Sequence, residues 1–185
     1  MEELIKSAKS GNLDGVEKAL AEGGNPARIV HWGDNALHAA AKEGHFKIVE
    51  LLLKDGRIHP NDLNESGYNA LHLALLMNHP RTIDLLLTDP RVDPTAPYTE
   101  RGLKRSPLEL AGHKEKLVNR LLEEPRVIKS LTAAIKTRLN LKTEDIEEAI
   151  AKGAWRRRRA AVMAHAAHWE RQAELGGRRT RRNKR

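Results

Sequence analysis

The chain has 185 residues and a formal net charge of +8, with 39% hydrophobic but only 3% aromatic residues and no cysteine. This length allows one domain of ordinary size with an appendage and excludes two full enzyme domains, while the lack of cysteine excludes a disulfide framework, thiolate catalysis and cysteine zinc sites. With so few aromatic residues, the core must be built from Leu, Ile, Val and Ala packed at close range, which favours stacked helices over a sandwich of sheets.

The start of the chain, Met1-Glu2-Glu3, lacks the basic and apolar regions of a signal peptide. No apolar run approaches the length of a transmembrane helix. We therefore expect an intracellular protein, cytoplasmic or nuclear, without a transmembrane segment.

An internal repeat of 33 to 34 residues begins near Met1. Residues 35–40 (NALHAA) return at an offset of 34 as NALHLA, and residues 49–53 (VELLL) return as IDLLL. Upstream, the segments AKSGN and VEKAL repeat the same pattern at an offset of 33, and a degenerate copy begins at Ser106 and ends in Leu121-Leu122. Self-similarity at this period indicates a solenoid of stacked repeats.

Helix start and stop residues agree with this period. Asn35 and Asn69 can each cap a helix at its N-terminus. In the last copy Ser106 can do the same, with Pro107 at the first helical position and Glu109 completing a capping box. Glycines suited to helix ends or tight turns recur at matching places: Gly11, Gly33, Gly44, Gly67 and Gly102.

These motifs resemble the ankyrin family, whose unit is a turn, a short helix opening with Thr-Pro-Leu-His-x-Ala, a Gly-His turn and a second helix ending in Leu-Leu. The resemblance covers residues 1–127 and implies an all-α solenoid of about four helix-turn-helix repeats. Ala36 and Ala70 stand where the family usually has Pro, and Asn78 stands where it usually has Gly. The segments DPRVDP at residues 89–94 and EPRV at residues 124–127 are similar to linkers in ankyrin proteins of large DNA viruses and protists.

Beyond the repeats, residues 128–153 are expected to form a helical cap, because apolar residues continue there at helical spacing. Residues 154–185 form a third segment, in which Trp155 and Trp169 fall on one face of an expected amphipathic helix that precedes an Arg-rich end. Residues 151–185 hold twelve basic against two acidic residues, net +10, which leaves net −2 for the first 150. A nearly neutral body therefore carries a cationic tail.

Catalytic chemistry is not expected. His165 and His168 can share a helical face, but no third ligand stands beside them, so we expect no metal site and no cofactor. The resemblance implies that His38 and His72 make structural hydrogen bonds between helix starts. No nucleophile motif, phosphate-binding glycine loop or paired-carboxylate pattern is present. We therefore expect neither enzyme activity nor a small-molecule substrate.

A protein partner is expected on the concave surface that the resemblance implies, made by the turn tips and the first helix of each repeat. The implied contact residues are His31, Trp32, Asp34, Lys42, Glu43, Glu65, Ser66, Tyr68, Leu76 and Met77. Trp32, Tyr68, Leu76 and Met77 are large and apolar or aromatic, so we expect them at the centre of a binding groove. The alternative is that Trp32 packs on the adjacent turn and Leu76 against a neighbouring helix.

The basic tail admits three interpretations. Its cations can neutralise phosphates of a nucleic acid, address the chain to the nucleus through a transport receptor, or dock onto another acidic surface such as a membrane or protein. These residues are Arg156, Arg157, Arg158, Arg159, Arg178, Arg179, Arg181, Arg182, Lys184 and Arg185. The sequence thus predicts a non-catalytic scaffold or adaptor with a tail for localisation or anchoring, the alternative being a nucleic-acid-binding protein that acts through the tail.

Overall fold

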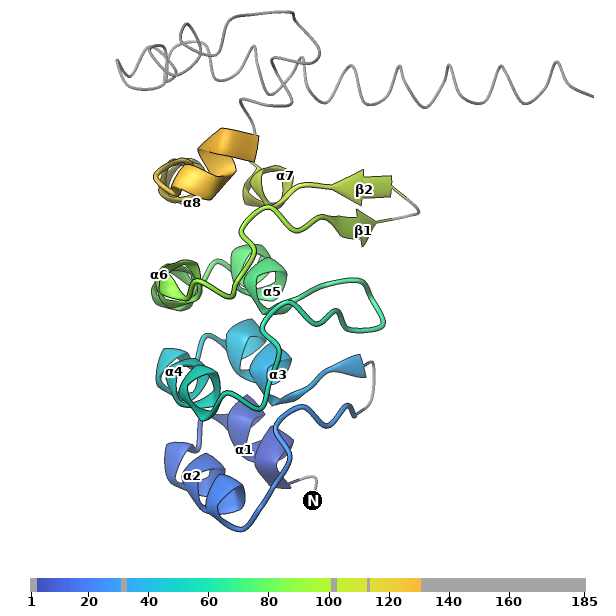
Figure 1. Ribbon diagram of the computed structural model, residues 1–185, viewed down its shortest axis with the longest axis vertical. Helices are drawn as coiled ribbons and strands as arrows, with labels where there is room; N and C mark the ends of the chain where they lie inside the picture. Colours follow the sequence, from blue (N-terminus) through green and yellow to red (C-terminus); the bar gives the residue numbers. More distant parts are fainter. Residues whose placement is uncertain (1–2, 31–32, 101–102, 113, 131–185) are drawn as a thin grey trace, which may run out of the picture. The chain divides into compact units, whose positions relative to one another are not determined.

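A computed structural model describes residues 3–30, 33–100, 103–112 and 114–130. Paired antiparallel helices follow one another along a stack (Figure 1). Their bounds are α1 Glu3–Ser10, α2 Leu13–Ala21, α3 Ala36–Glu43, α4 Phe46–Asp55, α5 Ala70–Met77, α6 Pro80–Thr88, α7 Pro107–Ala111 and α8 Glu115–Leu122, with two short strands, β1 Tyr98–Glu100 and β2 Leu103–Arg105, before α7.

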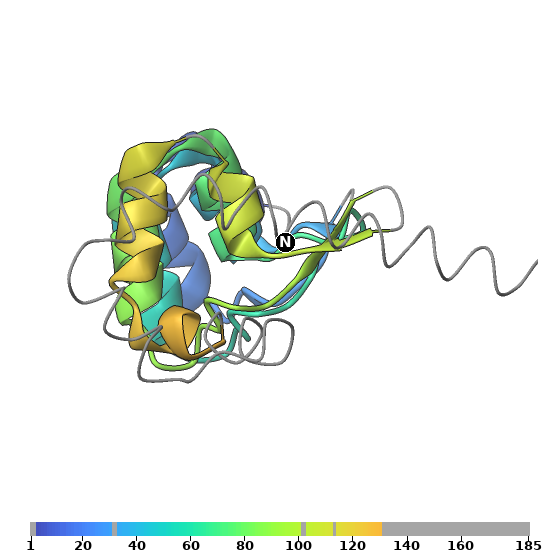
Figure 2. The ribbon, with the colours of Figure 1, turned by 90° about the horizontal axis from the view of Figure 1, so that it is seen from above.

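The helices form two columns. The inner helices are α1, α3, α5 and α7, and each contacts the next. The outer helices are α2, α4, α6 and α8, and α4 contacts both α2 and α6. Seen along the stack, the loops that precede α3, α5 and α7 project together to one side of the inner helices; we call these loops the fingers (Figure 2). The fold is the all-α ankyrin solenoid that the repeat predicts.

The inner helices begin where their caps predict. The Asn35 side-chain oxygen accepts hydrogen bonds from the N–H groups of Leu37 and His38, both at 3.0 Å, and Asn69 accepts one from His72 at 2.9 Å. These bonds satisfy backbone donors that have no partner inside the helix. At the last inner helix, Pro107 is the first residue and the Glu109 carboxylate accepts the Ser106 N–H at 2.7 Å.

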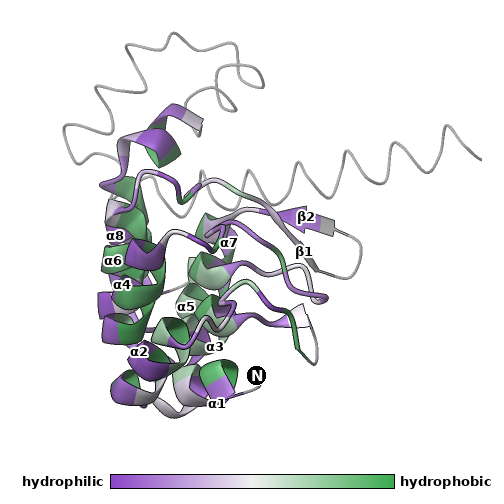
Figure 3. Ribbon diagram, turned by 60° about the horizontal axis from the view of Figure 1, so that its bottom comes forward, coloured by the Kyte–Doolittle hydropathy of each residue, from purple (hydrophilic) through white to green (hydrophobic). Residues whose placement is uncertain are grey.

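Small and branched aliphatic side chains fill the space between the columns. Ala40, Ala74 and Ala111 are fully buried at equivalent positions of three inner helices, as are Leu52 and Leu86 of the outer helices. Hydrophobic residues concentrate in the helices, whereas the loops are mostly hydrophilic (Figure 3). Burial of each leucine contributes about 1.5–3 kcal/mol, so the stack is stabilised through interfaces between repeats.

The finger before α7 differs from its predecessors because it is three residues longer. It forms an antiparallel hairpin in which Tyr98 pairs with Arg105 and Thr99 with Lys104. The period locates the insertion but does not predict the strands.

The described residues end in a helical turn at residues 125–130, where Val127 is buried. The rest of the expected cap, the amphipathic segment and the Arg-rich tail lie outside the described residues. All described residues belong to one compact unit, residues 1–130. In this part of the chain, no helix combines the length and hydropathy needed to cross a membrane.

Candidate partner-binding surface

Two buried histidines tie the fingers to the inner helices. The Nδ1 of His38 accepts the Asn35 N–H at 3.2 Å, so its proton lies on Nε2, which donates to the Asp62 carbonyl at 2.9 Å. His72 repeats this arrangement, accepting from Asn69 at 3.1 Å and donating to the Ala96 carbonyl at 2.8 Å. Burial lowers the pKa of both rings against the smaller opposing effect of these backbone bonds. The two histidines are therefore structural, as the resemblance implies, but their bonds join each helix start to the following finger and not to another helix start.

A second set of hydrogen bonds aligns the C-terminal ends of the inner helices. Nε2 of His45 bonds to the Lys9 carbonyl at 3.1 Å, and Nε2 of His79 bonds to the Lys42 carbonyl at 2.9 Å. One repeat further, the Lys114 ammonium donates to the Leu76 carbonyl at 3.1 Å. Lys9, Lys42 and Leu76 consequently occupy equivalent positions in three successive repeats.

An acid-x-Arg motif follows three of the outer helices, α4, α6 and α8. Arg57 pairs with Asp55 at 2.7 Å and donates to the Gly24 carbonyl at 3.1 Å. The same two contacts recur one repeat later. Arg91 pairs with Asp89 at 2.7 Å, and its guanidinium donates to the Leu53 carbonyl at 2.7 Å. The arginine hydrogen bonds hold the pKa of Asp55 and of Asp89 below the usual range.

The third motif pairs Arg126 with Glu124 at 2.7 Å and reaches the Val92 carbonyl at 2.6 Å. The linker segments noted in the sequence thus connect each repeat to the one before it.

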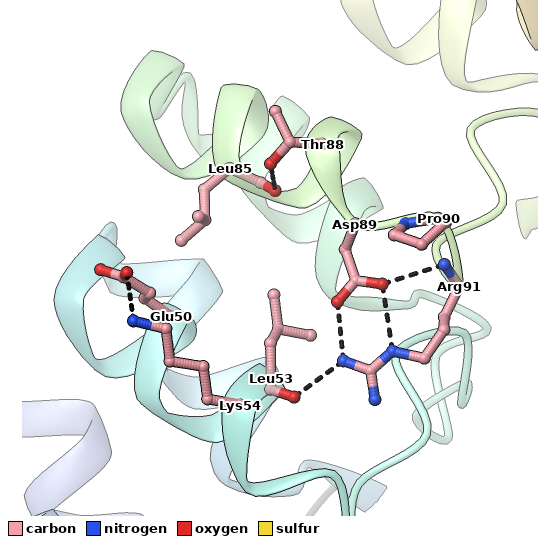
Figure 4. A pocket seen from close by; sticks show the side chains of 8 residues that line it. All are labelled: Glu50, Leu53, Lys54, Leu85, Thr88, Asp89, Pro90 and Arg91. Carbon is pink, nitrogen blue, oxygen red and sulfur yellow. Dashed lines mark hydrogen bonds and ion pairs between the residues drawn. The ribbon is translucent and has the colours of Figure 1, made fainter.

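A shallow depression of about 290 Å³ lies between α4 and α6 on the outer side. Leu53 and Leu85 line it, together with the ion pairs Glu50–Lys54 and Asp89–Arg91 (Figure 4). Because each of these charges has a partner inside the depression, none is held ready for a ligand. The depression is therefore a poor candidate for a binding site.

The residues expected to contact a partner come from the fingers and from the ends of the inner helices; we call this surface the inner face. Lys42 and Glu43 are exposed at the end of α3, and Glu65 and Ser66 are exposed in the finger before α5. Leu76 and Met77, at the end of α5, are 42% and 43% exposed. His31 and Trp32 lie outside the described residues.

Two expected contact residues are engaged within the fold. The Tyr68 ring stacks on the buried Tyr98 ring, with centroids 5.4 Å apart and planes 26° apart. Asp34 accepts a hydrogen bond from the Asn64 amide at 2.7 Å and so links adjacent fingers. Both side chains are half-buried, which makes them part of the frame that holds the fingers.

The structure adds two residues that sequence reasoning missed. Ile29 and Leu63 are 63% and 53% exposed, and they occupy the same position in successive fingers. With Leu76 and Met77 they are the large hydrophobic side chains that stand exposed in the described part of the chain, and all four belong to the fingers or to the end of α5. The offset of 34 residues, which continues to Pro97, is the signal that could have identified them.

A family model for ankyrin repeats, in three copies, matches residues 4–97, which is just over half of the chain. The chain belongs to the ankyrin-repeat family. This ankyrin protein is also similar to the nuclear factor NF-kappa-B p105 subunit of Rattus norvegicus, at 43% identity over 53 residues. That match covers 26% of this chain and 5% of the relative, so the chain spans a small part of that protein.

Ankyrin repeats act as protein-interaction modules and are generally not enzymes. Within the described residues of this ankyrin protein, no three His, Asp or Glu side chains are grouped in a way that could hold a metal ion. The large hydrophobic side chains that the described residues expose belong to the fingers and to the end of α5.

Proposed function

We propose that this ankyrin protein is a non-catalytic scaffold or adaptor that binds a protein partner through the inner face. The observation that carries the proposal is the exposure of Ile29, Leu63, Leu76 and Met77, which belong to the fingers and to the end of α5. Contiguous apolar surface on one side of a folded protein is typical of an interaction site.

The energetics favour the same surface. Transfer of a Leu, Ile or Met side chain from water into an interface contributes about 1.5–3 kcal/mol when burial is complete, and a few such anchors usually dominate affinity. The histidine bonds and the Tyr68–Tyr98 stack hold the fingers in place, which reduces the ordering entropy that a partner must overcome. Polar residues expected beside the anchors, among them Lys42, Glu43, Glu65 and Ser66, would form the rim.

The test replaces three of the exposed apolar residues and keeps the histidine bonds and the Tyr68–Tyr98 stack that hold the fingers. A Leu63→Ser, Leu76→Ser, Met77→Ser variant is expected to lose captured proteins from a nuclease-treated lysate while keeping the melting temperature of the wild-type chain. A Lys47→Ser, Lys116→Ser variant changes exposed positions on outer helices and should capture normally. Equal capture by both variants would refute the proposal, and a lower melting temperature of the serine variant would assign the three residues to packing.

The basic tail is proposed to localise the assembly to a nucleic acid, to the nucleus or to another acidic surface. Its support is the segregation of charge in the sequence, net +10 over residues 151–185. The alternative function is nucleic-acid binding through the tail, with the repeats serving only as a rigid support. Deletion of residues 154–185 separates the two, because partner capture then survives in the first case and all binding is lost in the second.

Nucleic-acid binding through the tail would weaken steeply with salt and differ little between sequences. The likeness of the linkers to those of viral and protist ankyrin proteins remains a prediction about origin. The match to the p105 subunit covers too little of that protein to transfer a partner.

A further inference from the structure

The inner helices change in chemical character along the stack. Lys9, Lys42 and Leu76 occupy equivalent positions, since their carbonyls accept the equivalent hydrogen bonds from the following repeats. One turn earlier on α1, Lys6 is also exposed, but it stands at the position of the buried residues Ala39 and Leu73 and is uncovered because α1 is the first helix of the described stack. Two repeats therefore present lysine where the third presents leucine.

Lys6, Lys9 and Lys42 of the inner helices lack ion pairs within the described residues, as do Lys47 and Lys116 of the outer helices. Many other cations are paired with carboxylates: Lys18 with Glu22, Lys54 with Glu50, Arg57 with Asp55, Arg91 with Asp89, Arg120 with Asp84 and Arg126 with Glu124. For Lys6, Lys9 and Lys42, no carboxylate of the described residues lies within pairing distance. Glu43 follows Lys42 directly, and adjacent residues of a helix do not face each other.

The other end of the same surface is apolar. Leu76 and Met77 are exposed at the end of α5, and Leu63 is exposed in the finger before α5. Along the inner helices, exposed lysines at the ends of α1 and α3 thus give way to exposed Leu76 and Met77 at the end of α5.

We infer that the partner is an acidic, amphipathic protein segment that lies along the stack, with carboxylates opposite Lys9 and Lys42 and apolar side chains opposite Leu76 and Met77. This inference rests on the proposed function and adds the chemistry of the partner. Neighbouring packed helices lie about 8–10 Å apart, so carboxylates and apolar anchors are separated by about 10 Å, which corresponds to about seven residues of a helix or three of a strand.

A nucleic acid fits this surface less well. Phosphates would pair with Lys9 and Lys42, but a phosphate backbone gains nothing from Leu76 and Met77. Protein segments that combine both groups satisfy the whole surface, because the lysines then steer and orient the partner while the apolar contacts supply most of the affinity.

The test is a selection of random peptides, displayed on phage, against the full-length chain and three full-length variants. The variants are Lys9→Glu/Lys42→Glu, the serine variant of Leu63, Leu76 and Met77, and Lys47→Glu/Lys116→Glu as the matched control on outer helices. Every arm carries the same basic tail, so acidic peptides that bind the tail are recovered equally and only differences between arms are counted. Melting temperatures verify that all four proteins are folded.

The wild-type chain and the control are expected to enrich peptides that join Asp or Glu to apolar residues. The Lys9→Glu/Lys42→Glu chain should recover about tenfold fewer of these peptides, since two surface ion pairs are each replaced by repulsion. Equal recovery on that variant overturns the inference. Enriched apolar peptides without acidic residues, lost only on the serine variant, would overturn it and leave the proposed function standing.

Two further outcomes complete the test. If no enriched peptide depends on Leu63, Leu76 and Met77, the proposed function fails together with the inference. If a labelled random-sequence oligonucleotide binds in a manner that Lys9→Glu/Lys42→Glu abolishes and the serine variant preserves, the lysines bind phosphates and the inference is wrong.

Discussion

The contact between α3 and α5 and the contact between α5 and α7 use different side chains at the C-terminal end of the first helix of each pair. We call each of these contacts a joint. At the first joint, Gly44 lies beneath the His79 ring, where an added Cβ would come within 2.5 Å of Nδ1. At the second joint Asn78 stands in the glycine position, and its Cβ occupies that space. Lys114 then replaces the ring and reaches the Leu75 and Leu76 carbonyls at 3.3 and 3.1 Å.

The histidine bond at the start of α5 has no equivalent donor at the start of α7 in the described residues. His72 bridges Asn69 and the Ala96 carbonyl at the α5 start, whereas Glu109 at the start of α7 accepts only from its own cap residue. Backbone acceptors at fixed places in the repeat need a donor, and the residue that supplies it varies with the space available. Degenerate repeats can therefore keep the same backbone geometry.

The largest effect is expected from His72→Leu. The leucine fills a similar volume but leaves the Asn69 N–H and the Ala96 carbonyl without their buried partner, which should lower the free energy of unfolding by about 2–4 kcal/mol. Urea denaturation measures this change in the free energy of unfolding. His59→Leu, at an exposed position, is the control and should change stability little. A loss as small as that of the control would show that the buried bonds contribute nothing.

A somewhat smaller loss is expected from Gly44→Ala. Gly44 has φ of +79°, a left-handed conformation that costs a residue with a Cβ about 1–2 kcal/mol, and the methyl group would also push the His79 ring from the Lys42 carbonyl. We expect a total loss of about 2–3 kcal/mol.

Asn78→Gly is the counterpart at the next joint. Asn78 adopts φ of 62° already, so glycine there relieves strain and should stabilise the chain by up to about 1 kcal/mol. Thermal unfolding of both variants compares the joints, and equal losses at the two positions would contradict the comparison.

Stability should also depend on pH through His38 and His72, with a smaller effect because both rings are retained. Their pKa values are lowered in the folded state, mainly by burial, so the unfolded chain binds more protons than the folded one below the ordinary value of about 6.5. Stability is therefore complete above that pH and declines as the pH falls through it. The lowered pKa of Asp55 and of Asp89 acts in a separate window, below about pH 4.

Urea denaturation from about pH 7.5 to about pH 5.5 measures this decline. A chain without His38 and His72, compared over the same range, should lose most of the slope. An unchanged slope would assign the dependence to other groups.

Much of the fold followed from the sequence because its signals are local. Asn35, Asn69 and Pro107 mark the helix starts. Gly44 and Asn78 mark two of the helix ends, and both adopt the positive φ for which these residue types are suited. The contacts between repeats did not follow, since a carbonyl acceptor leaves no trace in the sequence. Nothing in the linker motif itself reveals that Arg91 reaches the Leu53 carbonyl.

The candidate site was predictable in outline only. The family pattern places Leu76 and Met77 on the inner face, where both are exposed. Exposure depends on three-dimensional packing, so the pattern could not distinguish Tyr68, which stacks on Tyr98, from Leu63, which has a free surface. An insertion in the finger before α7 supplies Tyr98, and its strand pairing arises from contacts that the period does not encode.

The smallest effect is expected from Lys114→Met, which tests whether the substitute at the last joint is weaker than the histidine it replaces. The ammonium bonds to two carbonyls at the C-terminal end of α5, where a cation is also favoured by the helix dipole. Because Lys114 is exposed and its bonds compete with water, the loss should be about 0.5–1 kcal/mol and should shrink as salt is added. Lys116→Met, an exposed change two residues away without such bonds, is the matched control in the same denaturation experiment. If Lys114→Met costs as much as His79→Met, the joint between α5 and α7 is as tightly held as the joint between α3 and α5, and the variation between repeats reflects a choice of donor with no loss of strength.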